Sequence, residues 1–222
     1  MIARALAVLL TLTAGIAASP PAHAAPVPDK VVLSQTKHAD VDGDGRLDTV
    51  RIYNAGKKGD NTIWKVKVTT ATGRTGSLTV PIPSFEATKT LWRGWALLEG
   101  HRGAEILLEP PTDDFTTYIV LTWQGNALRR ELDPQRQKEW VAATETDRSG
   151  YRFFTSSGKR YVNAWQATCP DQPSKPGTCT VKTVRSVWRD GAWHKVGKLP
   201  TTKVSNTDIY RRAPLGALVI HR

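Results

Sequence analysis

The residues best suited to chemistry form one acidic stretch, ADVDGDGRLDTV, at residues 39–50. Its carboxylates stand at positions 1, 3, 5 and 9 of a loop that leads into a β-strand: Asp40, Asp42, Asp44 and Asp48. Calcium takes about six to eight oxygen ligands, and acids at this spacing in a tightly curved loop point inward together. The main-chain carbonyl of Arg46 stands at position 7, where a backbone oxygen suffices. The sequence therefore predicts one calcium ion, with a structural role, held by the four aspartates and that carbonyl.

The same residues allow two other interpretations, a turn without an ion and an EF-hand. Asp-Gly is common turn chemistry, so an Asp-rich turn can exist without an ion. An EF-hand requires an acid at position 12, where Arg51 stands within a β run, and it is excluded. Electrostatic repulsion favours an ion, because carboxylates about 5 Å apart repel by roughly 1 kcal/mol in water and by more at lower dielectric. We therefore expect a cation to hold this loop together.

A second group of acids occurs further along the chain: Glu99, Glu105, Glu109, Asp113 and Asp114. Two carboxylates can hydrolyse a glycosidic bond, but we interpret these residues as solvated loop charge. The sequence has neither a His-x-x-x-His pair nor a Gly-x-Ser-x-Gly motif. The prediction is a protein without catalysis. The alternative is a secreted hydrolase or enzyme accessory protein whose site combines loop acids with His101 or His194.

The elements that position these residues are predicted to be β-strands. Alternating apolar and polar residues with β-branched and aromatic side chains recur along the chain, as in WKVKVT at 64–69 and YIVLTW at 118–123. Glycine, proline and asparagine separate these runs. One stretch, residues 134–143, could make a short helix, although its two flanks have the pattern of strands. The fold class is therefore all-β.

A short sequence pattern occurs twice among the predicted strands. Residues 42–48 align with residues 99–105, with an acid at both ends and a glycine at the second position. Such units are typical of blade-like architectures, and we predict an abbreviated β-propeller-like fold, with a β-sandwich as the alternative. The single domain, residues 25–222, would contain units at 38–83, 91–132 and 140–197. Terminal strands at 30–35 and 215–222 are predicted to pair and complete a further sheet.

The acidic segment ADVDGDGRLDTVRIY, with GHRGAEILLEPPTDDFTTYIVLTWQGNALRRE downstream, resembles the FG-GAP or VCBS-type repeats of secreted bacterial proteins. In that family an acidic loop before a strand holds calcium in a β-propeller blade. The resemblance implies the same role for Asp40, Asp42, Asp44 and Asp48. It covers the first acidic loop well, residues 91–131 moderately and the last third hardly at all. In the second unit, His101 replaces the central aspartate.

The first 24 residues predict export. A basic start with Arg4 precedes an apolar run at residues 5–18, and Ala-His-Ala ends at Ala24. This is the pattern of a secretory signal peptide cleaved after Ala24. The apolar run is shorter than the roughly 20 residues of a membrane-spanning helix, and no later segment is long and apolar enough to cross a bilayer, so no transmembrane segment is expected after cleavage. In the oxidising environment outside the cell, Cys169 and Cys179 are predicted to form a disulfide across a Pro- and Gly-rich loop.

The composition bears on the partner. The formal net charge is +11, spread along the chain without a long basic tract. A basic exported protein attracts anionic polymers, so we expect a protein partner or an anionic glycan or cell-wall polymer, and no nucleic acid. Eight tryptophans are present, and most are expected in the core. Trp92 and Trp95 are the predicted binding surface. The sequence thus suggests a secreted, calcium-stabilised binding or adhesion module.

Overall fold

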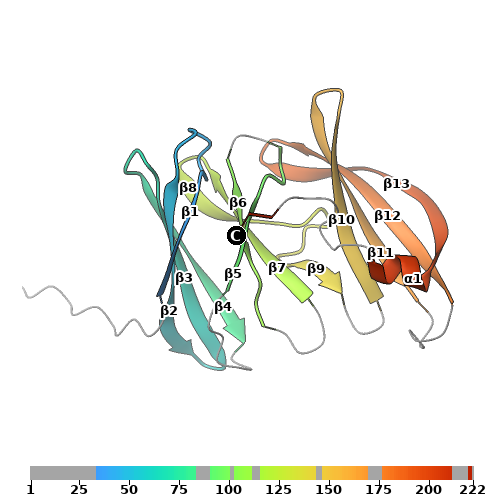
Figure 1. Cartoon of the computed structure of the whole chain (residues 1–222), viewed down its shortest axis with the longest axis horizontal. Helices are drawn as coiled ribbons and strands as arrows, with labels where there is room; N and C mark the ends of the chain where they lie inside the picture. Colours follow the sequence, from blue (N-terminus) through green and yellow to red (C-terminus); the bar gives the residue numbers. More distant parts are fainter. Residues whose placement is uncertain are drawn as a thin grey trace, which may run out of the picture.

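The computed structural model describes residues 34–83, 91–100, 103–111, 116–143, 147–169, 177–211 and 220–221. Three antiparallel meanders follow one another along this part of the chain, and none closes into a barrel. They lie in chain order from left to right in Figure 1. The predicted all-β class is confirmed.

The first two meanders have four strands each. The first, in the order β1-β2-β3-β4, consists of β1 (Ser34–Ala39), β2 (Asp48–Lys58), β3 (Asn61–Thr69) and β4 (Thr75–Pro83). The second consists of β5 (Trp92–Ala96), β6 (Glu105–Leu108), β7 (Thr116–Gln124) and β8 (Ala127–Glu131). The first meander thus spans residues 34–83, where a unit at 38–83 is predicted, and the second spans residues 92–131, where a unit at 91–132 is predicted.

The third meander covers the unit predicted at 140–197 and extends beyond it. It consists of β9 (Trp140–Ala143), β10 (Asp147–Ser156), β11 (Lys159–Thr168), β12 (Thr178–Arg189) and β13 (Ala192–Ser205), followed by the short helix α1 (Asn206–Arg211). Strand β9 pairs with both β7 and β10 and so joins the second and third meanders into one continuous sheet.

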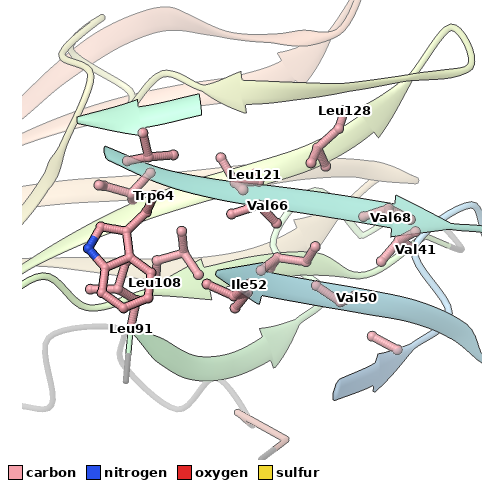
Figure 2. Close-up of a cluster of buried hydrophobic side chains, with 14 of the residues drawn as sticks. Val41, Val50, Ile52, Trp64, Val66, Val68, Leu91, Leu108, Leu121 and Leu128 are labelled. Atoms are coloured by element: carbon pink, nitrogen blue, oxygen red, sulfur yellow. The ribbon is translucent and has the colours of Figure 1, made fainter. Parts of the chain in front are cut away.

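In the second meander, which is the central sheet, β6 and most of β7 are buried on both faces because their residues alternate between two cores. Ile106 and Leu121 face the first meander, where they meet Val50, Ile52 and other apolar residues in the cluster of Figure 2. Leu107 belongs to a second cluster, against the third meander. Successive residues of a strand point to opposite faces, so a strand with both faces covered is buried along its whole length, as β6 is. The first meander therefore packs against one side of β6 and β7, and residues of the third meander, which is continuous with them through β9, pack against the other side.

The short helix that residues 134–143 could make does not form. Turns follow Pro134, and Trp140 begins strand β9. The Asp133 carboxylate accepts the N–H groups of Gln135 and Gln137, both at 2.8 Å. An aspartate that caps its own downstream amides offers the backbone an alternative to a helix. Arg136 has a φ of 72°, outside the right-handed helical region.

The chain ends do not form a sheet of their own within the described residues. Ser34 and Gln35 pair with β2, and His221 bridges Trp95 of β5. The rest of the predicted terminal strands, and the signal peptide, lie outside the described residues. Cys169 and Cys179 form the predicted disulfide, which packs against Ile209 of α1. In the part of the chain that the structure describes, no helix has the length and apolar character of a membrane span.

Candidate cation-binding pocket

The acidic loop before β2 is closed by Asp48. Its side chain is fully buried. One carboxylate oxygen accepts the N–H groups of Val41 at 2.8 Å and Asp42 at 3.3 Å, and the other accepts that of Ala71 at 2.8 Å. Hydrogen bonds to a charged acceptor are stronger than neutral ones. Asp48 thereby joins the start of the loop to the turn after β3.

The loop brings three of its four aspartates together. Oxygens of Asp40, Asp42 and Asp48 lie within 4.8 Å of one another. Asp44 is exposed and outside this group, and its carboxylate accepts the N–H of the exposed Arg46 at 2.8 Å. The loop curves through Gly43 and Gly45, whose φ angles are 74° and 86°. This left-handed conformation costs glycine little.

The gathered oxygens fit a calcium ion by their chemistry. All are hard carboxylate ligands, and a carboxylate oxygen that accepts one amide keeps a second lone pair for a metal. Asp40 uses its oxygens to accept the N–H groups of Gly43 at 2.8 Å and Gly45 at 2.9 Å. Burial raises the pKa of Asp42, and the charges of Asp48, Asp44 and Asp40 add to that rise. A bound cation would offset this repulsion.

The second meander repeats this loop closure at the aligned positions. Glu105 opens β6 as Asp48 opens β2. Its buried carboxylate accepts the N–H of Leu98, which corresponds to Val41 in the same alignment. The N–H of Glu99 also interacts favourably with it, as that of Asp42 does with Asp48. The alignment of residues 42–48 with 99–105 therefore corresponds to equivalent hydrogen bonds.

The interpretation of Glu99 and Glu105 as solvated loop charge is wrong. They are 5% and 1% exposed, and Glu131, at the end of β8, is 4% exposed. Carboxylate oxygens of the three lie within 4.8 Å of one another. We call this group the glutamate triad. Glu109 is half-buried and pairs with Arg93 at 3.2 Å, while Asp113 and Asp114 lie outside the described residues.

Glu131 was not predicted from the sequence because its neighbours in the triad are distant in the chain. Register places it there: Glu131 pairs with Val120 of β7, and Val120 pairs with Leu107 of β6, the strand that Glu105 opens. The three glutamate-bearing segments thus share the face of the central sheet that looks toward the third meander. The indole N–H of Trp193, from β13, donates to Glu131 Oε1 at 2.7 Å.

Residues of all three meanders line one pocket, which contains Asp42, Glu99 and Glu105 and which we call the acid pocket. It has a volume of about 520 Å³, and its walls include Asp42 from the first, Glu99 and Glu105 from the second, and Trp188 from the third. Gly103 lies against the Val41 carbonyl, where a side-chain Cβ would come within 2.5 Å. The Ala104 N–H donates to the Asp40 carbonyl at 2.8 Å. The aspartate loop and the loop before β6 therefore pack directly against each other.

Burial and mutual repulsion disfavour the ionised form of the carboxyl groups in the glutamate triad. Burial, followed by the charge of Glu99, raises the pKa of Glu105 well above its usual range. Burial raises the pKa of Glu131 likewise, with further contributions from Glu105 and Glu99. Burial lowers the pKa of the nearby Arg160, and the negative charge of Glu105 offsets part of that effect. Its guanidinium donates to the carbonyls of Leu98 at 2.9 Å and Leu97 at 3.1 Å.

We expect the stability of the protein in chelator to fall as the pH rises above the unfolded pKa of a glutamate, about 4.3, because Glu105 and Glu131 have raised pKa values in the fold. A carboxyl whose pKa is raised on folding stabilises the fold below its unfolded pKa of about 4.3, and that contribution is lost as the pH rises through the folded value. The slope reaches at most about 1.4 kcal/mol per pH unit for each group. Urea denaturation at a series of pH values measures it. Glu131→Gln should flatten the slope, and an unchanged slope contradicts the assignment.

The predicted binding surface, Trp92 and Trp95, is in part buried against the hydrophobic core. Trp92 and Trp95 are both half-buried and pack against the first apolar cluster. The Trp95 ring stacks on His221 with centroids 4.0 Å apart. His194 is half-buried and is not among the residues that line the acid pocket, and His101 lies outside the described residues.

A different concave surface, which the sequence did not predict, lies on the third meander. This groove, of about 420 Å³, is lined by Phe154, Tyr161, Arg185 and Lys198 among others. The rings of Phe154 and Tyr161 stack at 5.3 Å, and the Arg185 guanidinium lies 5.1 Å from the Phe154 centroid. The groove combines an aromatic platform with two cations. We call it the basic groove.

Comparisons of the chain with protein-family models, with curated proteins and with solved structures find no match.

Proposed function

We propose that the chain is an exported, non-catalytic β-repeat module of the FG-GAP or VCBS type. One calcium ion at Asp40, Asp42 and Asp48 stabilises it, and it binds an anionic glycan or cell-wall polymer at the cell envelope or in the medium. The observation that carries the proposal is the gathering of these three carboxylates within 4.8 Å at the start of β2. The ion's contribution is to offset their mutual repulsion and hold the loop against the turn after β3.

Calcium should raise the stability of the purified protein. An ion that binds only the folded state stabilises it by about 4 kcal/mol when its free concentration is about 1,000 times the dissociation constant. Asp42→Ala should weaken the calcium dependence of thermal unfolding, because it removes one of the gathered ligands. Asp60→Ala, an exposed aspartate in the turn between β2 and β3, is the matched control. Equal melting temperatures in calcium and in chelator would refute the calcium part of the proposal.

The basic groove is the surface best suited to an anionic polymer. Aromatic rings stack on sugar faces, and arginine pairs with carboxylate or phosphate groups. We expect retention of the protein on immobilised polyuronate or teichoic acid to fall about tenfold with Arg185→Ala, a loss of roughly 1.4 kcal/mol. Arg189→Ala, exposed on the same strand, should change retention little. Equal effects of the two substitutions indicate nonspecific charge attraction and remove the groove assignment.

A hydrolase is the second candidate, and the acid pocket favours it. A buried carboxyl with a raised pKa is suited to general acid catalysis, and Glu105 has this property beside Glu99. Hydrolysis of glycan substrates that Glu105→Gln abolishes, with the fold intact by circular dichroism, would establish it. Absence of turnover on the polymers that bind the protein supports the non-catalytic module.

A further inference from the structure

The proposed function of the chain as a binding module gives no role to the glutamate triad. Each of its members is almost fully buried: Glu99, Glu105 and Glu131 are 5%, 1% and 4% exposed. Fully desolvating an ionised carboxylate is costly unless the charge is paired or coordinates a metal. Three such groups within 4.8 Å of one another therefore call for a compensating charge.

One oxygen of the triad is buried without an N–H donor. Oε1 of Glu131 accepts the Trp193 indole N–H, whereas Oε2, on the side chain buried among the other two glutamates, has only the Glu99 carboxyl, when that is protonated, as a hydrogen-bond partner. The charges that act on Glu131 are those of Glu105 and Glu99, and both are negative. A buried carboxylate oxygen left unsatisfied loses its hydration without compensation. This oxygen is placed to bind a cation.

The neighbouring cation makes its described hydrogen bonds to the backbone and not to the triad. The charge of Glu105 acts on Arg160. Its Nε and one terminal nitrogen, however, donate to the carbonyls of Leu98 and Leu97. The Arg160 guanidinium thus stabilises the loop before β6 and is committed to backbone oxygens.

The repeat relates the triad to the aspartate loop. Asp42 and Asp48 correspond to Glu99 and Glu105, and both pairs belong to carboxylate groups able to hold a metal. Asp40 corresponds to Leu97, which is 42% exposed and offers no carboxylate. Glu131 supplies the third carboxylate from β8 instead. The second group therefore combines one loop with the ends of two strands.

We propose that Glu99, Glu105 and Glu131 form a second divalent-cation site, of the hard, oxygen-preferring class of calcium and magnesium. A divalent ion leaves one net negative charge on the three carboxylates, which the amides of the loop and the Trp193 indole stabilise. The pocket lined by Glu99 and Glu105 provides the route of entry. Since Glu131 contacts Trp193 of β13, the ion would tie the second meander to the third.

The test counts ions on the purified protein by calorimetric titration with calcium and, separately, with magnesium. We expect two sites in the wild type. Glu131→Gln, close in shape to the native side chain, should remove one site, and Asp42→Ala should weaken the other. Glu109→Gln, outside the triad, is the matched control and should keep both. This pair of variants separates failure of the triad from failure of the calcium loop.

Terbium luminescence gives a second, local readout. Tryptophan sensitises a nearby terbium ion, and Trp193 contacts Glu131 directly. Trp193→Phe should lower the sensitised signal that Glu131→Gln removes. If Glu131→Gln leaves the ion count and the terbium signal unchanged, the proposal is wrong and the triad is held by shared protons. A wild type whose only ion is lost with Asp42→Ala would overturn the proposal as well.

Discussion

Asp48→Ala is expected to destabilise the protein by roughly 3–5 kcal/mol in the presence of chelator. The substitution leaves three backbone N–H groups, those of Val41, Asp42 and Ala71, without their acceptor. Each buried donor that loses its partner costs about 1–3 kcal/mol. Because Asp48 is fully buried, water cannot replace the carboxylate without local opening of the loop.

Urea denaturation with tryptophan fluorescence measures this effect. Asp44→Ala is the control, because Asp44 is exposed and its carboxylate accepts the N–H of the equally exposed Arg46; it should cost less than about 1 kcal/mol. Asp48→Asn keeps one acceptor oxygen and should lie between the two. A loss below about 1 kcal/mol for Asp48→Ala would show that the loop does not depend on this carboxylate.

Trp140→Ala is expected to cost a similarly large amount, about 3–5 kcal/mol. Trp140 has no exposed surface. Its ring lies 4.8 Å from that of Tyr151 and 6.1 Å from that of Phe153, centroid to centroid. It belongs to β9, the strand that joins the second meander to the third. The substitution thus leaves a cavity at this junction.

Thermal and urea unfolding of this variant should show a large loss of stability. Because β9 couples two meanders, the unfolding transition should also be broader. Trp140→Phe is the graded control: it keeps most apolar contact but removes the indole N–H that donates to the Glu131 carbonyl at 3.3 Å. It should cost about 1–2 kcal/mol. Similar stabilities of Trp140→Ala and the wild type would contradict the tight packing of β9.

Much of the local structure was predictable because its causes are local. Alternation with β-branched residues predicted the strands, and two cysteines flanking a Pro- and Gly-rich loop predicted the disulfide. The alignment of residues 42–48 with 99–105 predicted equivalent loops, and Asp48 and Glu105 accept equivalent amides. Turn chemistry and side-chain period act over a few residues, and a single sequence displays them directly.

Errors arose where a local preference met a longer-range one. Residues 134–143 contain good helix formers, but the Asp133 side chain binds the following amides and Trp140 is buried in the core. Tertiary packing routinely overrides such weak preferences. The prediction of Trp92 and Trp95 as a binding surface is a different case, because both are half-buried and pack in part against the first apolar cluster, and it stays a prediction.

The sequence alone thus determined that this chain is a series of β meanders with an acidic, glycine-curved loop before one strand. Only the tertiary structure decided that Glu99 and Glu105 are buried, that Glu131 joins them, and that the first acidic loop faces the same pocket. The physical reason is that burial depends on which sheet covers which face. That choice is made by pairing and stacking between segments far apart in the chain, such as β6, β8 and β13.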